Sequence, residues 1–266
     1  MVYRIEAEAK VNIGLKITGR RDDGYHTLSS YFLLIPFSDD IEVEINNGDS
    51  TEIEGNEGYL ESGEDLMAKA VRLYREKTGL VFGVHIRIRK NIPTKAGLGG
   101  GSSDAAAVLR VLNRHFGAMD SASLLSLSSS VGADVPFFTS GFRFAYVEGV
   151  GEKIKERSFP GGYRYITLFR APGSGTSTKE AYGKLDSFQL DSWPLPDISF
   201  PIERTSFPND FEKIEGTEMY DNLKNRLGKN DYLSLSGSGS VWFLLSEMEW
   251  KGTESELIAS RKLFID

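Results

Sequence analysis

The chain has 266 residues, with 31 basic and 38 acidic side chains that give a net charge of −7, and 40% of its residues are hydrophobic. This composition is typical of a globular protein that can bury a sizeable core. The acidic balance argues against nucleic acid as a partner, because phosphate backbones are bound by basic surfaces. It remains compatible with a small anionic substrate, since a pocket can be locally positive.

The sequence contains no cysteine and only three histidines, His26, His85 and His115. Disulfides, zinc–thiolate sites and cysteine nucleophiles are therefore excluded, and a histidine metal cluster is disfavoured. The first ten residues lack the apolar core of a signal peptide. The longest apolar run, Tyr31–Phe37, is too short to cross a bilayer. We expect a soluble, cytoplasmic protein with no membrane partner.

The first ninety residues are predicted to form strands and one helix. The clearest strand is Asp40–Ile45, where polar and apolar residues alternate up to the turn-forming segment Asn46–Gly48. A helix is predicted between Ser62, which can cap its start, and Gly79, which can end it. The other predicted strands are, in chain order, Val2–Ile17 (one strand or two), Gly24–Phe37 and Val84–Ile88.

The rest of the chain mixes helices and strands. Helices are predicted over Ser102–Phe116 and Ala122–Ser130, and the proline-rich stretch Trp193–Pro208 is expected to be irregular. A mainly helical Phe211–Leu227 follows, and a final helix is predicted over Thr253–Leu263. The predicted strands of this part are Phe142–Val147, Tyr163–Phe169, Tyr232–Leu235 and Val241–Leu245. Hairpin-like strand pairs among helices indicate an α+β fold.

The segment Pro93–Ser103 (PTKAGLGGGSS) has four glycines within five positions, between a predicted strand and a predicted helix. Glycine is entropically costly to order, so something must require a backbone without Cβ atoms there. Consecutive N–H groups in such a loop can bind an anion, and the following helix adds free N–H groups and its dipole. An alanine-rich amphipathic helix follows at once, which favours a phosphate-binding loop over a flexible linker. The predicted nucleotide-binding residues are Pro93, Lys95, Gly97, Leu98, Gly99, Gly100, Gly101, Ser102 and Ser103.

Two common phosphate-binding motifs do not fit this loop. A Walker A motif ends in glycine, lysine and serine or threonine, and no lysine precedes Ser102. The dinucleotide fingerprint G-x-G-x-x-G matches Gly97 and Gly99 but has Ser102 at its third glycine. The acidic residue expected about 20 positions later is also missing.

The loop resembles the second motif of the GHMP kinases, the superfamily of galactokinase, homoserine kinase, mevalonate kinase and phosphomevalonate kinase. Within it, the chain resembles the family of 4-diphosphocytidyl-2-C-methyl-D-erythritol kinases. These matches run in order over most of the chain, although residues 186–208 match nothing. The segments that carry the narrower resemblance are Ala9–Asn12 (AKVN), Thr18–His26 (TGRRDDGYH), Gly132–Phe138 (GADVPFF), Glu148–Glu152 (EGVGE) and Ser236–Gly239 (SGSG).

The resemblance implies both a fold and a reaction. The fold is a two-lobed α+β GHMP kinase fold. Residues 1–155 would form an ATP-binding lobe like domain 2 of ribosomal protein S5, residues 156–266 a ferredoxin-like lobe, and the active site would lie in the cleft between them. The reaction is transfer of the γ-phosphate of ATP, with Mg²⁺, to the 2-hydroxyl of diphosphocytidyl-methylerythritol in the non-mevalonate isoprenoid pathway. The implied partner is this small molecule, and the chain is expected to be a monomer or a homodimer.

The same resemblance implies two catalytic residues, Lys10 and Asp134. Phosphoryl transfer needs one group to accept the hydroxyl proton, and Asp134 is the expected base. The alternative is that Asp134 only caps a turn. Lys10 would keep this carboxylate ionised and contact the transferring phosphate. Apart from the resemblance, a lone lysine near the N-terminus would be read as a solvated surface charge.

The expected substrate-binding residues are Asn12, Tyr25, His26 and Tyr182. Tyr25 and His26 would hold the cytosine ring by stacking and by polar contacts to its edge. Tyr182 would supply the second aromatic face, and Asn12 would contact the sugar alcohol. The alternative for the tyrosines is ordinary packing in a core or hairpin.

Three residues near the loop have open roles. Lys95 lies where the family often has small residues, so it either folds over the phosphates or is solvated. Ser103 is a possible Mg²⁺ ligand. Asp104 suits the helix dipole but would repel a triphosphate, so we expect it to point away from the nucleotide or to help place Mg²⁺. It is also the main rival to Asp134 as the base.

Two other functions stay open from the sequence. One is a GHMP kinase of the homoserine or mevalonate type, which has no use for a cytidine site. The other is a non-catalytic, nucleotide-binding regulator on the same fold, which would be expected to lose the base while keeping the loop.

Overall fold

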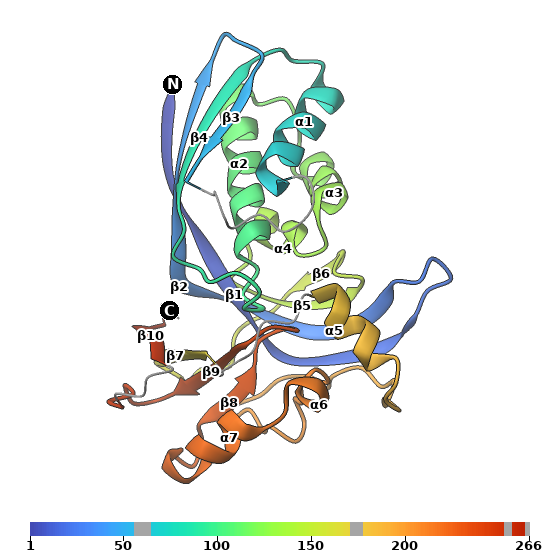
Figure 1. Cartoon of the computed structure of the whole chain (residues 1–266), viewed down its shortest axis with the longest axis vertical. Helices are drawn as coiled ribbons and strands as arrows, with labels where there is room; N and C mark the ends of the chain where they lie inside the picture. The colour runs from blue at the N-terminus through green and yellow to red at the C-terminus, as the bar shows by residue number, and fades with distance from the viewer. Residues whose placement is uncertain (56–64, 171–177, 253–256, 264–266) are drawn as a thin grey trace. The chain divides into compact units, whose positions relative to one another are not determined.

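The computed structural model describes residues 1–55, 65–170, 178–252 and 257–263 (Figure 1). Over these ranges the fold is α+β, as predicted, with ten strands in two sheets and seven α-helices. The chain forms two compact units. The first comprises Met1–Ala9, Phe37–Thr94 and Gly99–Phe142, and the second comprises Lys10–Pro36, Lys95–Leu98 and Arg143–Asp266. The expected lobes, 1–155 and 156–266, have other boundaries than these two units, and they stay a prediction.

The first sheet has the strand order β3-β4-β2-β5-β6, and β1 also pairs with β2. Strands β3 and β4 are parallel, whereas the pairs β2–β4, β2–β5 and β5–β6 are antiparallel. The strand bounds are Val2–Arg20 (β1), His26–Asn46 (β2), Thr51–Glu54 (β3), Gly83–Arg89 (β4), Phe144–Gly149 (β5) and Lys153–Glu156 (β6).

The register of β2 against β4 confirms the alternation predicted from the sequence. Because side chains of a strand alternate between faces, every second residue of each strand points into the core. The apolar residues lie directly opposite one another and are all buried: Ile41 with Ile88, Val43 with Ile86, and Ile45 with Val84.

Helices α1 to α4 pack together in the first unit (Figure 1). Helix α1 is capped by Asp65, whose carboxylate accepts hydrogen bonds from Met67 N at 2.7 Å and Ala68 N at 3.1 Å. The predicted cap, Ser62, lies outside the described residues. As predicted, Gly79 ends α1 in a left-handed conformation with φ +70°. The helix bounds are Leu66–Thr78 (α1), Gly100–Phe116 (α2), Ser121–Val131 (α3) and Val135–Ser140 (α4).

The second sheet belongs to the second unit and is antiparallel throughout, with the order β10-β7-β9-β8. Its strands are Tyr165–Arg170 (β7), Tyr232–Leu235 (β8), Val241–Ser246 (β9) and Leu257–Lys262 (β10). The last strand corrects the helix predicted over Thr253–Leu263, of which residues 253–256 are not described. Pairing with the edge of β7 and burial of Ala259 and Leu263 outweigh the helix propensity of this segment.

The remaining helices of the second unit are short. They are Thr178–Leu185 (α5), Glu212–Glu215 (α6) and Glu218–Leu223 (α7), followed by the 3₁₀ turn Lys224–Arg226. The predicted helical stretch Phe211–Leu227 is thus interrupted, at Gly216, where φ is +78°. The predicted irregular stretch Trp193–Pro208 is confirmed, since it contains neither helix nor strand.

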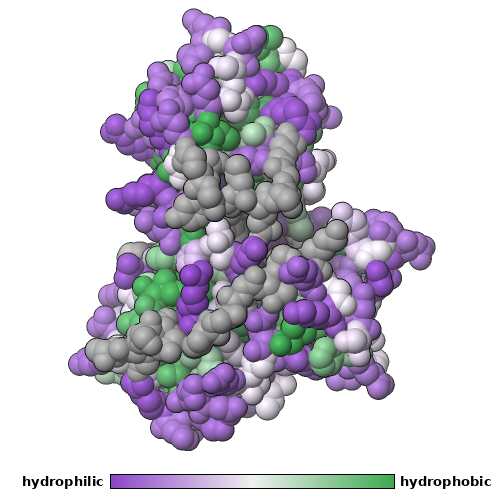
Figure 2. Space-filling model, viewed as in Figure 1, coloured by the Kyte–Doolittle hydropathy of each residue, from purple (hydrophilic) through white to green (hydrophobic). Residues whose placement is uncertain are grey.

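The surface drawn in Figure 2 is mostly hydrophilic, with apolar side chains scattered among polar ones. Apolar side chains instead fill the cores, where Tyr31, Tyr74 and Trp242 are at most 1% exposed. Among the described helices, none combines the length and the apolar composition that a bilayer crossing requires.

Candidate active site

The predicted phosphate-binding loop has the strand–loop–helix arrangement expected from the sequence, since it connects β4 to α2. Gly97 and Gly99 both adopt left-handed conformations, with φ of +74° and +71°. Lys95 does so too, at φ +54°, and it is the one non-glycine residue with positive φ in the described part of the chain. Strain of this kind persists where the surrounding structure enforces it. Gly100 and Gly101 begin α2, where backbone N–H groups have no partner within the helix.

In the second unit, Gly97 packs against the turn Ser236–Gly239 between β8 and β9. A Cβ atom on Gly97 would lie 1.8 Å from Ser236 O, and one on Gly239 would lie 2.1 Å from Gly97 N. Ser236 Oγ donates a hydrogen bond to Gly97 O at 3.0 Å, and Ser240 N donates one to Lys95 O at 3.2 Å. This turn therefore fixes the start of the loop, which requires glycine on both sides of the contact.

Lys10, the predicted catalytic lysine, is a buried residue of β1, with 3% of its surface exposed. Its Nζ donates hydrogen bonds to Asn12 Oδ1 at 2.5 Å and to Gly97 O at 2.9 Å, and lies 4.9 Å from the centre of the Phe32 ring. A buried ammonium is costly unless acceptors surround it. The reading of Lys10 as a solvated surface charge is therefore wrong.

Asn12 holds Lys10 in place. Its Oδ1 accepts from Lys10, and its Nδ2 donates to Ser30 Oγ at 3.0 Å. Ser30 Oγ in turn donates to Gly14 O at 2.7 Å. Asn12 is 1% exposed, so its amide is engaged inside the protein, and its contact with the sugar alcohol stays a prediction.

The helical end of the loop, in the first unit, is also tied down by side chains. Ser103 Oγ donates to Glu8 O at 2.7 Å. Asp104 accepts a hydrogen bond from Lys90 Nζ at 2.7 Å, and Lys90 also pairs with Asp39. Burial raises the pKa of Asp104 to about 7, against the lowering effect of Lys90. Asp104 is 2% exposed and bonded to a lysine, and its role as the rival base stays a prediction.

Asp134 occupies the N-cap position of α4 in the first unit, but its side chain makes no capping hydrogen bond. The side chain thus does not cap α4, and both the role as the base and the alternative of a turn residue stay predictions. The residue is half-buried, at the start of a helix whose next four residues, Val135–Phe138, are buried. A half-buried carboxylate beside apolar side chains has the chemistry expected of a proton acceptor.

The structure brings together two of the three side chains predicted to bind the cytosine ring. The rings of His26 and Tyr182 stack with centroids 5.2 Å apart, and Phe211 meets Tyr182 edge-on at 4.9 Å. His26 Nε2 lies 2.7 Å from Asp186 Oδ1. Tyr25 is 66% exposed, in the turn just before His26. Neither Asp186 nor Phe211 was predicted, because nothing in their local sequence signals these contacts.

No cluster of three or more metal-ligating histidine or carboxylate side chains occurs among the residues that the structure describes. Mg²⁺ commonly binds through one or two carboxylates, water and substrate phosphates instead of an all-protein cage. For a nucleotide-held ion, the protein's part is to hold the phosphates, and the start of α2 at Gly100 and Gly101 offers backbone N–H groups for them. The Ser103 hydroxyl donates its proton to Glu8 O, and its role as a ligand of Mg²⁺ stays a prediction.

Comparison with known proteins identifies a family for part of the chain. Residues 65–142, which include the loop and Asp134, match the family GHMP kinases N terminal domain. A 4-diphosphocytidyl-2-C-methyl-D-erythritol kinase of Polaromonas naphthalenivorans is 42% identical over 192 residues, 70% of this chain and 63% of that protein. The chain thus spans under two thirds of that relative.

Two further matches extend over most of both chains. A kinase of the same name from Francisella philomiragia is 34% identical over 245 residues, 91% of this chain and 86% of that protein. A crystal structure of 4-(cytidine 5'-diphospho)-2C-methyl-D-erythritol kinase superposes with a TM-score of 0.68 and 32% identity, over 92% of this chain and 90% of the other. The chain therefore belongs to the 4-diphosphocytidyl-2-C-methyl-D-erythritol kinase family.

Proposed function

We propose that this protein transfers the γ-phosphate of ATP to the 2-hydroxyl of 4-diphosphocytidyl-2-C-methyl-D-erythritol, as a kinase of the non-mevalonate isoprenoid pathway. The observation that carries the proposal is the buried Lys10, whose ammonium is bonded to the carbonyl of Gly97 in the phosphate-binding loop. A buried ammonium is costly to desolvate, so a lysine held against the loop favours a role in charge stabilisation over a role in packing alone.

The nucleotide would bind through the backbone N–H groups of the loop and of the first turn of α2. The residues in these positions are Gly97, Leu98, Gly99, Gly100, Gly101, Ser102 and Ser103, with Pro93 and Lys95 at the entry. When bound, Mg²⁺ neutralises charge on the phosphates. ATP as the phosphate donor suits the cytoplasmic location expected from the sequence.

In the proposed reaction Asp134 accepts the proton of the 2-hydroxyl as its oxygen bonds to the γ-phosphorus. The bond from that phosphorus to the β–γ bridging oxygen breaks, and ADP leaves. Lys10 stabilises the negative charge on the transferring phosphoryl group. Its position is fixed before substrate arrives, which is the arrangement that makes such a donor effective.

The cytosine ring would bind at the aromatic side chains His26 and Tyr182, with Tyr25 on the adjoining turn. Stacking of a base on an aromatic ring is worth about 1–3 kcal/mol. Because His26 and Tyr182 stack on each other in this structure, we expect the base to insert beside or between them. Asn12 would face the sugar alcohol.

ADP release with Mg²⁺ and ATP, measured against a panel of alcohols, tests the function. The panel contains diphosphocytidyl-methylerythritol, mevalonate, homoserine and galactose. We expect turnover with the cytidylyl compound alone. Turnover with another alcohol would retain the kinase and reject the cytidine site. ATP binding without any turnover would favour a regulator.

The Asp134→Asn variant tests the base. It keeps the side-chain size but cannot accept the proton, so we expect kcat to fall by about 10²–10⁴-fold. The matched control is Asp120→Asn in the same unit, because Asp120 caps α3 through Ser123 N at 2.8 Å. Asparagine caps a helix about as well as aspartate, so the control should leave kcat unaltered and stability nearly so. An Asp134→Asn enzyme with near-normal kcat would remove Asp134 from the base role.

A further inference from the structure

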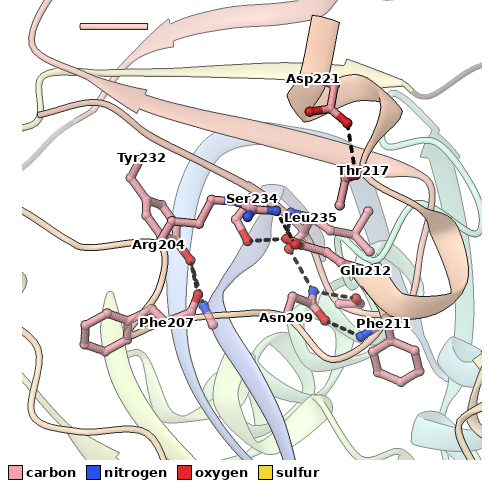
Figure 3. A network of polar contacts seen from close by, with 12 residues as sticks. Arg204, Phe207, Asn209, Phe211, Glu212, Thr217, Asp221, Tyr232, Ser234 and Leu235 are labelled. Carbon is pink, nitrogen blue, oxygen red and sulfur yellow. Dashed lines mark hydrogen bonds and ion pairs between the residues drawn. The ribbon is translucent and has the colours of Figure 1, made fainter. Parts of the chain in front are cut away.

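Four successive residues, Asn209–Glu212, run from the irregular stretch into the first residue of α6 in the second unit. Figure 3 shows the polar contacts of two of them, Asn209 and Glu212. All four are buried, with exposures between 0% and 9%. Asp210 Oδ2 accepts a hydrogen bond from Ile17 N at 2.9 Å, which anchors the segment to β1. Glu212 accepts from Ser234 Oγ at 3.2 Å and pairs with Arg204, which anchors it beside β8.

Asn209 reaches toward the phosphate-binding loop. Its Nδ2 donates to Leu235 O at 2.9 Å and to Gly237 O at 2.8 Å, two carbonyls on either side of Ser236. Ser236 Oγ donates to Gly97 O, the same oxygen that accepts from Lys10. One amide group therefore fixes the turn, the turn fixes Gly97, and Gly97 fixes the ammonium of Lys10.

Phe211 reaches in the other direction, toward the aromatic side chains. Its ring is fully buried and meets Tyr182 at 85°, with centroids 4.9 Å apart. Tyr182 in turn stacks on His26. An edge-on contact of this kind has a preferred geometry, so Phe211 sets the position of the Tyr182 ring.

We propose that Asn209 and Phe211 are positioning residues that act on separate halves of the reaction. Asn209 orients Lys10 and the start of the phosphate loop, whereas Phe211 orients the aromatic surface for the cytosine. The proposal rests on the proposed function for the identity of the two ligands. Its distinctive consequence is that neighbouring residues of one segment control different kinetic constants.

The test compares Asn209→Ala and Phe211→Leu for kcat and for both Michaelis constants. With Asn209→Ala we expect kcat to fall about tenfold or more, because small displacements of a reacting group are costly. Asn209→Ala also removes the Oδ1 that accepts from Phe211 N at 3.0 Å. Ser236→Ala leaves that bond intact, so it is the variant whose KM for the cytidylyl substrate should stay within about twofold. With Phe211→Leu we expect that KM to rise several-fold, while kcat and the KM for ATP stay within about twofold.

Two further variants keep the test decisive. Ser236→Ala removes only the hydroxyl that bonds to Gly97 O, so it should reproduce the direction of Asn209→Ala even if the latter fails to fold. Tyr163→Phe is the structural control, because it removes a buried hydrogen bond from Ile202 N at 2.8 Å that leads to neither site. This control should lower stability without changing any kinetic constant.

The proposal is overturned if Ser236→Ala and Phe211→Leu shift the same constants together, or if neither shifts them more than Tyr163→Phe does. Failure of the proposed function would show separately, as absence of wild-type turnover with the cytidylyl compound. In that case calorimetric binding of a non-hydrolysable ATP analogue and of cytidine diphosphate to each variant still tests the division of roles. Loss of both affinities together would contradict it.

Discussion

The burial of Lys10 indicates that its ammonium has a specific role. Its stem and ammonium lie inside the second unit, and two oxygens, Gly97 O and Asn12 Oδ1, accept from it. Replacing it by methionine keeps the length and removes the charge. Since the lost group is a preorganised donor to developing charge, we predict a fall in kcat of about 10²–10³-fold. The urea midpoint should also fall, because Asn12 Oδ1 loses the hydrogen bond from Lys10, a cost of about 1–3 kcal/mol. The kcat is therefore compared on enzyme that is fully folded.

A second lysine of the same strand provides the control for that variant. Lys16 is also mostly buried, but its Nζ lies 3.9 Å from Asp191 and makes no described contact with the loop. Lys16→Met should therefore leave kcat within about twofold of wild type. If both variants lost activity equally, the effect of Lys10 would be structural, and its role in phosphoryl transfer would be withdrawn.

Among the structural elements, the phosphate-binding loop depends most strongly on glycine. Gly97→Ala would place a Cβ atom 1.8 Å from Ser236 O, in a residue with φ +74°. Gly79 has nearly the same backbone conformation, with φ +70°, and a Cβ atom there would have no other atom within 4 Å. Gly79→Ala is therefore the matched variant. Both variants bear the left-handed cost of about 1–2 kcal/mol. Only Gly97→Ala adds overpacking, worth about 1–3 kcal/mol more.

Urea unfolding followed by circular dichroism measures this difference, because it reports on both units. Gly97→Ala should be the less stable variant and should also lose activity, since the Ser236–Gly239 turn must move to accept the methyl group. Equal stability of the two variants would mean that the turn yields easily. The turn would then not hold the loop, and the argument that Asn209 acts through it would fail as well.

At this same scale, local patterns predicted the elements whose signal is local. The sequence predicted the alternation in Asp40–Ile45, the glycine run and the helix end at Gly79, because each depends on neighbours in the chain. Strand β10 was not, because helix-forming residues there are paired to β7, an edge formed some ninety residues earlier.

The polar contacts of the site were the hardest part to predict. Each of these contacts joins residues that are far apart in sequence, so it exists only once the fold has brought its partners together. The pairs are Lys10 with Gly97, His26 with Asp186, and Asn209 with Gly237. The family resemblance indicated Lys10, His26 and Asp134 but gave no reason to select Asp186, Asn209 or Phe211. These supporting residues became visible only from hydrogen bonds and ring contacts.

For the molecule as a whole, tryptophan fluorescence can report the unfolding of one unit separately from the other. All three, Trp193, Trp242 and Trp250, belong to the second unit. Trp242 is 1% exposed in β9, so its fluorescence should respond when that unit unfolds. Fluorescence therefore follows the second unit alone, whereas circular dichroism follows both. Unfolding curves that differ between the two signals would show that the units do not unfold together.

The same probe can measure how one buried carboxylate affects stability across pH. Burial raises the pKa of Glu212, against the lowering effects of Arg204 and of its hydrogen bonds. Above the ordinary glutamate pKa, the unfolded chain has released this proton while the folded chain still holds it. Unfolding then releases a proton, so rising pH favours the unfolded state. This contribution to stability is complete below the unfolded pKa and is lost as pH rises through the folded pKa.

Glu212→Gln removes the titration but keeps an oxygen for Ser234 Oγ and Leu235 N. The variant also deprives Arg204 of its charged partner, a loss that is constant wherever Glu212 would be ionised in both states. We predict that the free energy of unfolding of wild type minus variant, from urea titrations followed by tryptophan fluorescence, falls as pH rises from about 4 into the neutral range. A difference that rose with pH would mean that Arg204 dominates and that the pKa of Glu212 is lowered instead.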